Sequence, residues 1–295
     1  MIFDDPQGWH RSCGSFSIHT RSSIMNVRFW GVRGSIAVSG GSFLRTGGNT
    51  TCIELEHEGS RLVLDGGTGL QALGSALIAE HGPSTELTVL FSHVHWDHIQ
   101  GVPFFGPAFH PDSRIVFAGG PGVEEALVRQ MRPPTFPVGI ETLQARLDFV
   151  ELPPRQTLRI DPFTVHVEAM SHPDGILIYR IEAGERSVVF ATDIEHGDTL
   201  DRRLLDLSCG ADLLIHDAQY TEGEYRGLTG PSRRGWGHSS WEQAVEAGRA
   251  AGVDRLALFH HDPTRTDPQV AMIESVAAQR LCGTFAAREG CRVAL

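Results

Sequence analysis

The chain contains no lysine, and all 25 of its basic residues are arginine. This absence excludes Schiff-base catalysis through a lysine amine and ATP binding through a P-loop lysine. Cysteine is also scarce, because five widely scattered thiols in 295 residues provide neither a disulfide framework nor a cysteine-type zinc knuckle. No apolar run approaches the roughly 20 residues that cross a bilayer, so we expect a cytoplasmic protein with no membrane partner.

Basic charge is in short supply as well. The formal net charge of −11 argues against broad contact with a nucleic-acid backbone and favours a small substrate. Residues 1–24 are rich in Ser, Arg and His and lack the apolar core of a signal peptide, so we expect a disordered extension there. The remaining chain is long enough for one large domain or two small ones.

What is present is a dense group of metal-binding side chains, Ser92-His93-Val94-His95-Trp96-Asp97-His98. On an extended segment His93 and His95 point the same way, and a turn then brings Asp97 and His98 to a second position. The motif therefore predicts ligands for two ions. Imidazole and carboxylate without thiolate favour Zn²⁺, with Mn²⁺ or Fe²⁺ as alternatives. A histidine-rich surface turn is the alternative reading, and composition gives it roughly a few chances in a thousand.

Short β-prone runs alternate with helical stretches on both sides of this motif. Strands are predicted at residues 27–31, 51–56, 61–65, 87–91, 163–169, 176–182, 187–191, 213–216 and 256–259, and helices at 70–80 and 240–251. Two β-rich halves with outer helices predict an α/β sandwich of two packed sheets. The proline-rich residues 132–137 are interpreted either as a loop near the site or as a plain surface connection.

Further candidate ligands lie where later strands end. His172 follows the strand ending near Met170, Asp193 follows residues 187–191, and His260 and His261 follow residues 256–259. Each residue alone is more often part of a turn than a ligand. Because all of them share the position of the first motif relative to a strand, they reinforce one another.

The motif His-x-His-x-Asp-His, a later His, a later Asp and a final His together resemble the signature of the metallo-β-lactamase superfamily. The resemblance runs from about Val27 to the end and is strongest to the phosphodiesterase branch, which includes ribonuclease Z and cyclic-nucleotide phosphodiesterases. It implies an αββα sandwich of two mixed sheets, with residues 25–295 as the catalytic domain, and a homodimer. It also implies the ligand sets: His93, His95 and His172 for one ion, Asp97, His98 and His260 for the other, and Asp193 as the bridge.

Two further elements resemble the same branch. Gly237-His238-Ser239-Ser240 is similar to the element whose histidine donates a proton, and His216-Asp217-Ala218 is similar to the element whose carboxylate orients that histidine. The resemblance therefore implies His238 as general acid, with Asp217 as its partner. A helix cap and a buried amide contact are the alternative roles. We expect the two ions to lower the pKa of a bridging water so that hydroxide attacks phosphorus, with Asp97 able to accept a proton.

Departures from the family narrow the substrate. His172 and Asp193 are 21 residues apart, which leaves no room for the tRNA-binding arm of ribonuclease Z, so tRNA is not expected. The scattered cysteines cannot form the structural zinc site of the phosphonate-pathway enzyme. A small phosphodiester remains, with a 3′,5′-cyclic nucleotide as the leading hypothesis. Two alternatives stay open: an acyl or thioester hydrolase of the same fold, and a slow, metal-dependent nucleotide-binding regulator.

Overall fold

Two seven-stranded mixed sheets pack face to face in the computed structural model, which describes residues 24–295. The predicted disordered extension therefore lies outside the described residues, apart from its last residue. The first sheet has the order β14-β1-β2-β3-β4-β5-β6. Its strands are β1 (Met25–Gly31), β2 (Cys52–His57), β3 (Ser60–Leu64), β4 (Glu86–Leu90), β5 (Arg114–Gly119), β6 (Arg146–Glu151) and β14 (Arg292–Ala294).

The second sheet has the order β13-β12-β11-β10-β9-β8-β7. Its strands are β7 (Gln156–Ile160), β8 (Phe163–Met170), β9 (Ile176–Ala183), β10 (Arg186–Ala191), β11 (Leu213–Asp217), β12 (Arg255–Phe259) and β13 (Thr284–Ala286). Each sheet is antiparallel in one half and parallel in the other. Strands β3 to β6 run parallel in the first sheet, as do β10 to β13 in the second.

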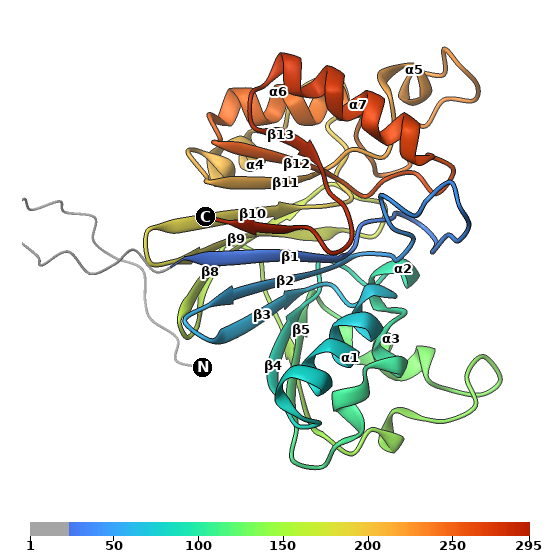
Figure 1. Ribbon diagram of the computed structural model, residues 1–295, viewed down its shortest axis with the longest axis vertical. Helices are drawn as coiled ribbons and strands as arrows, with labels where there is room; N and C mark the ends of the chain where they lie inside the picture. Colours follow the sequence, from blue (N-terminus) through green and yellow to red (C-terminus); the bar gives the residue numbers. More distant parts are fainter. Residues whose placement is uncertain (1–23) are drawn as a thin grey trace, which may run out of the picture.

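Helices cover the outer face of each sheet (Figure 1). The helices are α1 (Gly69–His81), α2 (Trp96–Ile99), α3 (Val123–Gln130), α4 (Arg202–Ser208), α5 (Glu222–Tyr225), α6 (Trp241–Ala251) and α7 (Asp267–Arg280). Phe29, Phe190 and Phe259 are fully buried between the sheets, and two further apolar clusters lie under the outer helices. This arrangement confirms the predicted αββα sandwich. None of these helices in residues 24–295 is long and apolar enough to cross a membrane.

Local sequence explains the elements that were predicted. The β2–β3 hairpin turns at Glu58 and Gly59, which have φ of 51° and 81°, as a two-residue turn of this kind requires. Helix α6 begins with a capping box in which the Ser240 hydroxyl accepts from the Gln243 amide, and it ends at Gly252 in the left-handed region. Strands β5 to β7, β13 and β14 and helices α2 to α5 and α7 were not predicted.

The fold gathers the ends of several strands at one edge of the sandwich. Strands β3 and β4 are parallel neighbours in the first sheet, and β10, β11 and β12 are parallel neighbours in the second. Parallel strands present their carboxyl ends together, so the polar residues that follow them meet. Helix α2, which carries part of the first motif, lies at this edge, on the right of Figure 1.

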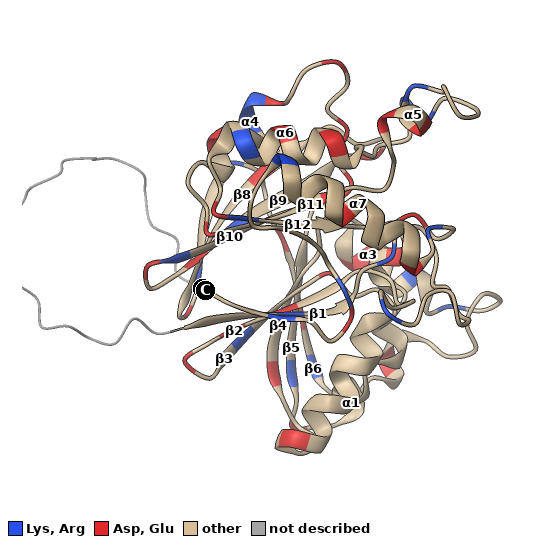
Figure 2. Cartoon of the chain, turned by 45° about the horizontal axis from the view of Figure 1, so that its top comes forward, with Lys and Arg blue, Asp and Glu red and all other residues tan. Residues whose placement is uncertain are grey.

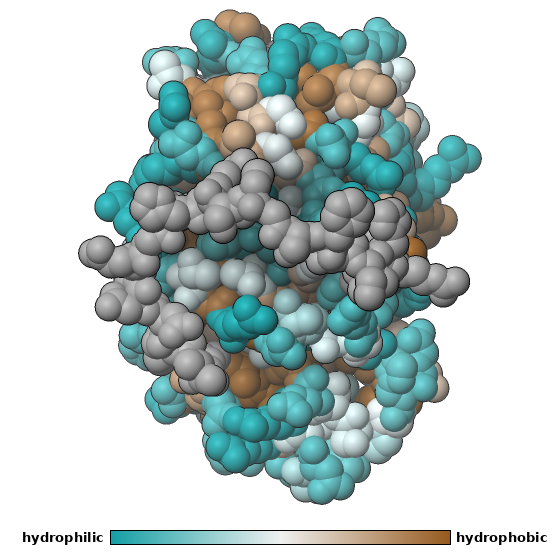
Figure 3. All heavy atoms as spheres, turned by 90° about the vertical axis from the view of Figure 1, so that its left-hand side faces the viewer, coloured by the Kyte–Doolittle hydropathy of each residue, from teal (hydrophilic) through white to brown (hydrophobic). Residues whose placement is uncertain are grey.

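The surface carries both signs of charge. Basic and acidic residues are interspersed over the helices and strand ends in Figure 2, and no broad basic area is visible in that view. The opposite side of the molecule from α2 is seen in Figure 3, where the described residues present a mostly hydrophilic face with smaller apolar patches. The proline-rich residues 132–137 connect α3 to the chain leading into β6 and form no helix or strand.

Candidate metal centre

Three predicted histidines meet at the strand ends. His93 and His95 follow β4 of the first sheet, and His172 follows β8 of the second. One ring nitrogen from each lies within 4.8 Å of the others. His95 Nδ1 and His172 Nε2 face each other at 3.2 Å. The two sheets therefore bring together a set of three imidazoles that the sequence separates by almost 80 residues.

A second group lies beside the first and contains two carboxylates. Asp97, His98, Asp193 and His260 have donor atoms within 4.8 Å of one another, and all four residues are buried. Asp193 Oδ2 lies 3.3 Å from His98 Nε2 and 3.7 Å from His93 Nε2 of the first group. The Asp193 carboxylate thus stands between the two groups. His261 points elsewhere, because its Nε2 donates to the Ala287 carbonyl at 3.0 Å.

The ring nitrogen that faces away from the cluster has a partner in all five histidines. The pairs are His93 Nδ1 with Ser92 Oγ (3.0 Å), His95 Nε2 with Asp174 (3.0 Å), His98 Nδ1 with Asp65 (2.7 Å), His172 Nδ1 with the Gly237 carbonyl (3.1 Å) and His260 Nδ1 with Gln219 Oε1 (2.8 Å). Such contacts fix the tautomer and the orientation of a metal-bound imidazole. The free electron pairs are therefore directed into the two groups.

The donor set fits divalent cations. His93 Nε2 and His98 Nε2 are buried and have no hydrogen-bond partner among residues 24–295, although an orphaned buried nitrogen is costly. Two buried carboxylates, Asp97 and Asp193, also lie close together and need positive charge nearby. Burial lowers the pKa of His93 well below its usual value, which keeps the ring neutral, as a metal ligand must be.

The backbone is bent sharply at the positions that supply these groups. Asp65, Asp193 and His260 have φ of 60°, 49° and 58°, in the left-handed region that non-glycine residues rarely adopt. Each such residue costs on the order of 1–3 kcal/mol, and such strain clusters at functional sites. Gly34 and Gly237 permit close approach to the centre, because a methyl group on either would lie 2.5 Å or 2.3 Å from the rings of His260 and His172.

His238 and Asp217, the predicted proton donor and its partner, are in direct contact. His238 Nδ1 donates to Asp217 Oδ2 at 2.8 Å, and the other carboxylate oxygen accepts the amides of Gln219 and Ser239. Burial opposes protonation of His238, but Asp217 outweighs it and raises the pKa of His238 to about 9. Its Nδ1 is also 3.9 Å from Asp193, so the pair adjoins the second group.

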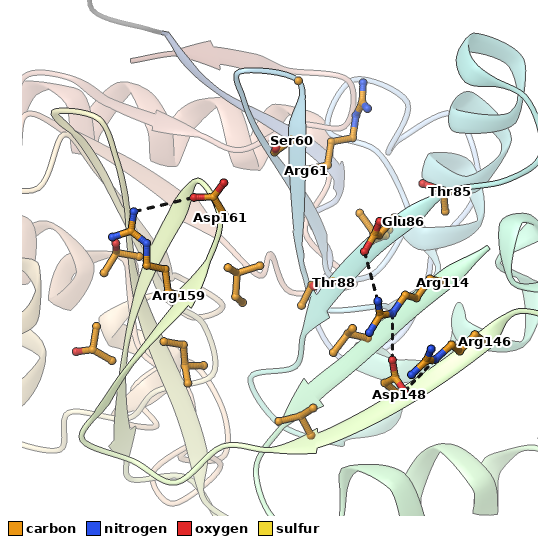
Figure 4. A pocket seen from close by; sticks show the side chains of 18 residues that line it. Ser60, Arg61, Thr85, Glu86, Thr88, Arg114, Arg146, Asp148, Arg159 and Asp161 are labelled. Carbon is orange, nitrogen blue, oxygen red and sulfur yellow. Dashed lines mark hydrogen bonds and ion pairs between the residues drawn. The ribbon is translucent and has the colours of Figure 1, made fainter. Parts of the chain in front are cut away.

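One cavity in the described part of the chain adjoins the site and a larger one does not. A cavity of about 360 Å³ is lined by His93, His95 and apolar residues such as Met170 and Leu177, so it opens beside the three histidines. A larger one, about 1300 Å³, lies at the starts of β3 to β6 and contains none of the predicted site residues. Figure 4 shows Arg114 in the larger cavity directed toward Glu86 and Asp148. Exposed ion pairs of this type contribute little to the stability of the fold.

Comparison with known proteins agrees with the geometry. Residues 60–261 match the family described as beta-lactamase superfamily domain. The chain belongs to the beta-lactamase superfamily. Within this superfamily, the chain is 25% identical over 260 residues to ribonuclease Z of Exiguobacterium sibiricum, which covers 72% of this chain and 82% of that protein. It is 26% identical over 282 residues to ribonuclease Z of Haloferax volcanii, covering 78% and 84%.

Solved structures show the same fold. The metallo-beta-lactamase fold protein YhfI from Bacillus subtilis aligns with a TM-score of 0.71 and 20% identity, over 92% of this chain and all of that one. The short form of human tRNase Z aligns with a TM-score of 0.62 and 17% identity, over 91% and 98%. The superfamily fold and the clustered donors together imply bound divalent metal ions.

Several residues that orient the centre were missed in the sequence. Asp65 accepts the His98 ring, the Ser92 amide and the Ser92 hydroxyl, and Gln219 accepts the His260 ring. Asp65 did carry a signal, because it is an acid that ends a predicted strand and precedes Gly66-Gly67, close to the position relative to a strand of the residues that were chosen. Gln219 carried none. The Ser35 backbone amide donates to Asp97 Oδ2 at 2.7 Å, and such a backbone contact leaves no mark on residue type.

Proposed function

We propose that the protein is a metal-dependent phosphodiesterase that hydrolyses small phosphodiesters, with 3′,5′-cyclic nucleotides as the leading substrates. The observation that carries the proposal is the His238–Asp217 pair beside two adjacent sets of metal donors. Thioester hydrolysis releases a thiolate, which can depart without a proton donor. A buried histidine held by a carboxylate suits a reaction whose leaving group, an alkoxide, must be protonated.

The proposed ligands follow the two groups. His93, His95 and His172 hold one ion, Asp97, His98 and His260 hold the other, and Asp193 lies between them. Nitrogen and oxygen donors without thiolate favour Zn²⁺. When bound, a pair of such ions lowers the pKa of water to near neutrality and withdraws charge from a phosphoryl oxygen.

His238 provides the proton for the departing oxygen. Its Nδ1–H is engaged with Asp217, so the proton it transfers is the one on Nε2. Asp217 is itself fixed by the amides of Gln219 and Ser239, which prevents the carboxylate from turning away. A carboxylate in this position stabilises the imidazolium form that acts as the acid. Asp97 is the second catalytic candidate, as an acceptor for the proton of the attacking water.

The connections around the site favour a small substrate. Between His172 and Asp193 the chain forms only the β9–β10 hairpin, so no arm for a long RNA projects from this part of the molecule. The interspersed charges also provide no broad basic surface in the view of Figure 2. Relatives named ribonuclease Z support a phosphodiester as the bond that is cleaved. Homodimerisation stays a prediction.

The test compares four substrates: bis(p-nitrophenyl) phosphate, 3′,5′-cyclic nucleotides, a thioester and a cephalosporin. Protein loaded separately with Zn²⁺ and Mn²⁺ should cleave the phosphodiesters, and a chelator or Asp193→Ala should abolish cleavage. A His81→Gln variant serves as the matched control, because that exposed histidine lies at the end of α1, outside both groups. Cleavage of the thioester or lactam without phosphodiester turnover would place the protein among acyl hydrolases. Binding of a cyclic nucleotide without consumption would indicate a regulator.

A further inference from the structure

Trp236 is exposed although it lies two residues before His238. Just over half of its surface, 53%, is open to solvent. The amides on either side of it, those of Gly235 and Gly237, both donate to the Glu195 carboxylate, at 2.8 and 2.9 Å. The backbone is therefore held at two points while about half of the Trp236 surface stays exposed. An exposed aromatic side chain on a fixed backbone offers a surface on which a base can stack.

The same segment is attached to the metal centre. The Gly237 carbonyl accepts the ring N–H of His172 at 3.1 Å, and the Gly237 α-carbon packs against that ring. Glu195, which holds the amides beside Trp236, is two residues after Asp193. Trp236 thus lies at the rim of the candidate site, on the side where His238 is found.

Arg233 is stacked on this indole and has no acidic partner. Its guanidinium carbon lies 4.4 Å from the centre of the Trp236 ring. The two other arginines of this segment form ion pairs, Arg226 with Glu222 and Arg234 with Asp198, whereas no ion pair of Arg233 occurs among the described residues. Arg233 therefore keeps an unneutralised positive charge beside an aromatic face, in a protein whose net charge is −11.

Arg233 also lies close enough to Tyr220, which contacts the proton donor His238, to act on it electrostatically. Burial and Asp217 raise the pKa of Tyr220, and the positive charge of nearby Arg233 acts in the opposite direction. The Tyr220 ring in turn packs edge-on against the His238 ring, with centroids 5.7 Å apart. Arg233 and Trp236 are consequently placed to contact the part of a substrate that lies next to His238.

We propose that Arg233 and Trp236 form a nucleotide subsite, in which the guanidinium binds the phosphate charge and the indole stacks on the nucleobase. The inference rests on the proposed function and narrows it to phosphodiesters that carry a base. Guanidinium groups bind phosphate oxygens through paired N–H donors, and indoles stack on bases of any sequence. Another Arg–Trp pair, Arg280 over Trp241 at 4.6 Å, differs because Trp241 is only 6% exposed and has no face free for a ligand.

The experiment measures calorimetric binding of adenosine 5′-monophosphate and of ribose 5-phosphate, which lacks only the base, to the metal-loaded protein. The wild type should bind the nucleotide at least about fivefold more tightly, the effect of one stacked base. Trp236→Ala should abolish this preference, and Trp236→Phe should retain most of it. Arg233→Gln should weaken both ligands by about tenfold or more. Arg280→Ala is the matched control and should leave both affinities unchanged.

Equal binding of the two ligands to the wild type, or an unchanged preference in Trp236→Ala, would overturn the proposal. Hydrolysis of bis(p-nitrophenyl) phosphate by the same preparations separates the two levels of inference. A base preference that depends on Trp236 without any hydrolysis would refute the proposed function and leave the subsite standing. Hydrolysis without a base preference would refute the subsite alone.

Discussion

Replacing Asp217 by asparagine should disable proton donation by His238 while the metal centre remains loaded. Asp217 Oδ1 accepts the amides of Gln219 and Ser239, at 3.0 and 3.3 Å, and Oδ2 accepts the Nδ1–H of His238 at 2.8 Å. An asparagine must keep its oxygen on the two backbone amides, because its NH₂ group cannot accept from them. The NH₂ group then faces His238, and the ring becomes a neutral acceptor at Nδ1. Neutral imidazole is a far weaker acid than imidazolium.

The expected loss is that of a general acid, roughly 10²–10⁴ in kcat, or about 3–5 kcal/mol. It should appear with cyclic nucleotides, whose leaving alkoxide needs a proton, and be small with bis(p-nitrophenyl) phosphate, whose leaving phenolate is stable without one. The assay is kcat for both substrates at equal metal content. A uniform loss over both substrates would refute the reasoning. So would a double variant, Asp217→Asn with His238→Ala, that is much slower than His238→Ala alone, because residues that act as a unit are not additive.

Three further predictions concern the surrounding structure. Asp65→Asn should weaken metal binding about 10- to 100-fold in a chelator competition, because it loses a carboxylate that orients a ligand; unchanged affinity would contradict that role. Gly237→Ala and Gly235→Ala should each lower the free energy of unfolding by about 1–2 kcal/mol, because the φ angles of 86° and 82° are unfavourable for alanine. Only Gly237→Ala should also lower metal affinity, because its methyl group meets the His172 ring, and equal affinities would argue against this contact. Burial and a neighbouring histidine lower the pKa of His196 to about 3, so the unfolded chain takes up a proton first as the pH falls below about 6.5. His196→Gln should therefore reduce the loss of unfolding free energy between pH 7 and pH 5 by about 2 kcal/mol in urea titrations, and equal pH slopes would disprove it.

Local patterns predicted the sandwich and the groups at its edge. Strands such as β4 and β12 end in apolar residues and are followed within three residues by a histidine, so both the element and the candidate ligand can be read from neighbouring residues. Elements that depend on a distant partner could not be predicted in this way. Strand β14 has three residues and exists because it pairs with β1. Strand β6 lacks a clear alternation of buried and exposed residues, because four of its six residues are half-buried. The sequence pattern of a strand is therefore weak there.

Some residues of the site can likewise be recognised from local sequence, whereas others depend on a distant partner. Ligand types and their spacing are local, but the contacts that orient them join distant segments, such as Asp65 with His98. The buried contact between His196 and His216 joins a residue in the loop after β10 to a residue in β11. The sequence around either histidine does not indicate that they meet. A carboxylate or an imidazole becomes an orienting group only when the fold supplies its partner. Physical contact across the sheets, rather than residue type, defines these positions.

The division of the donors between the two sheets affects how the protein is made. On a ribosome, the segment after β4 emerges early and exposes His93, His95, Asp97 and His98, while His260 follows β12 near the end of translation. Neither half of the chain alone carries all the donors of either group. We therefore expect metal to be incorporated only after the second sheet has been synthesised and has packed against the first. A fully metal-loaded protein would then be one in which both sheets have folded and packed together.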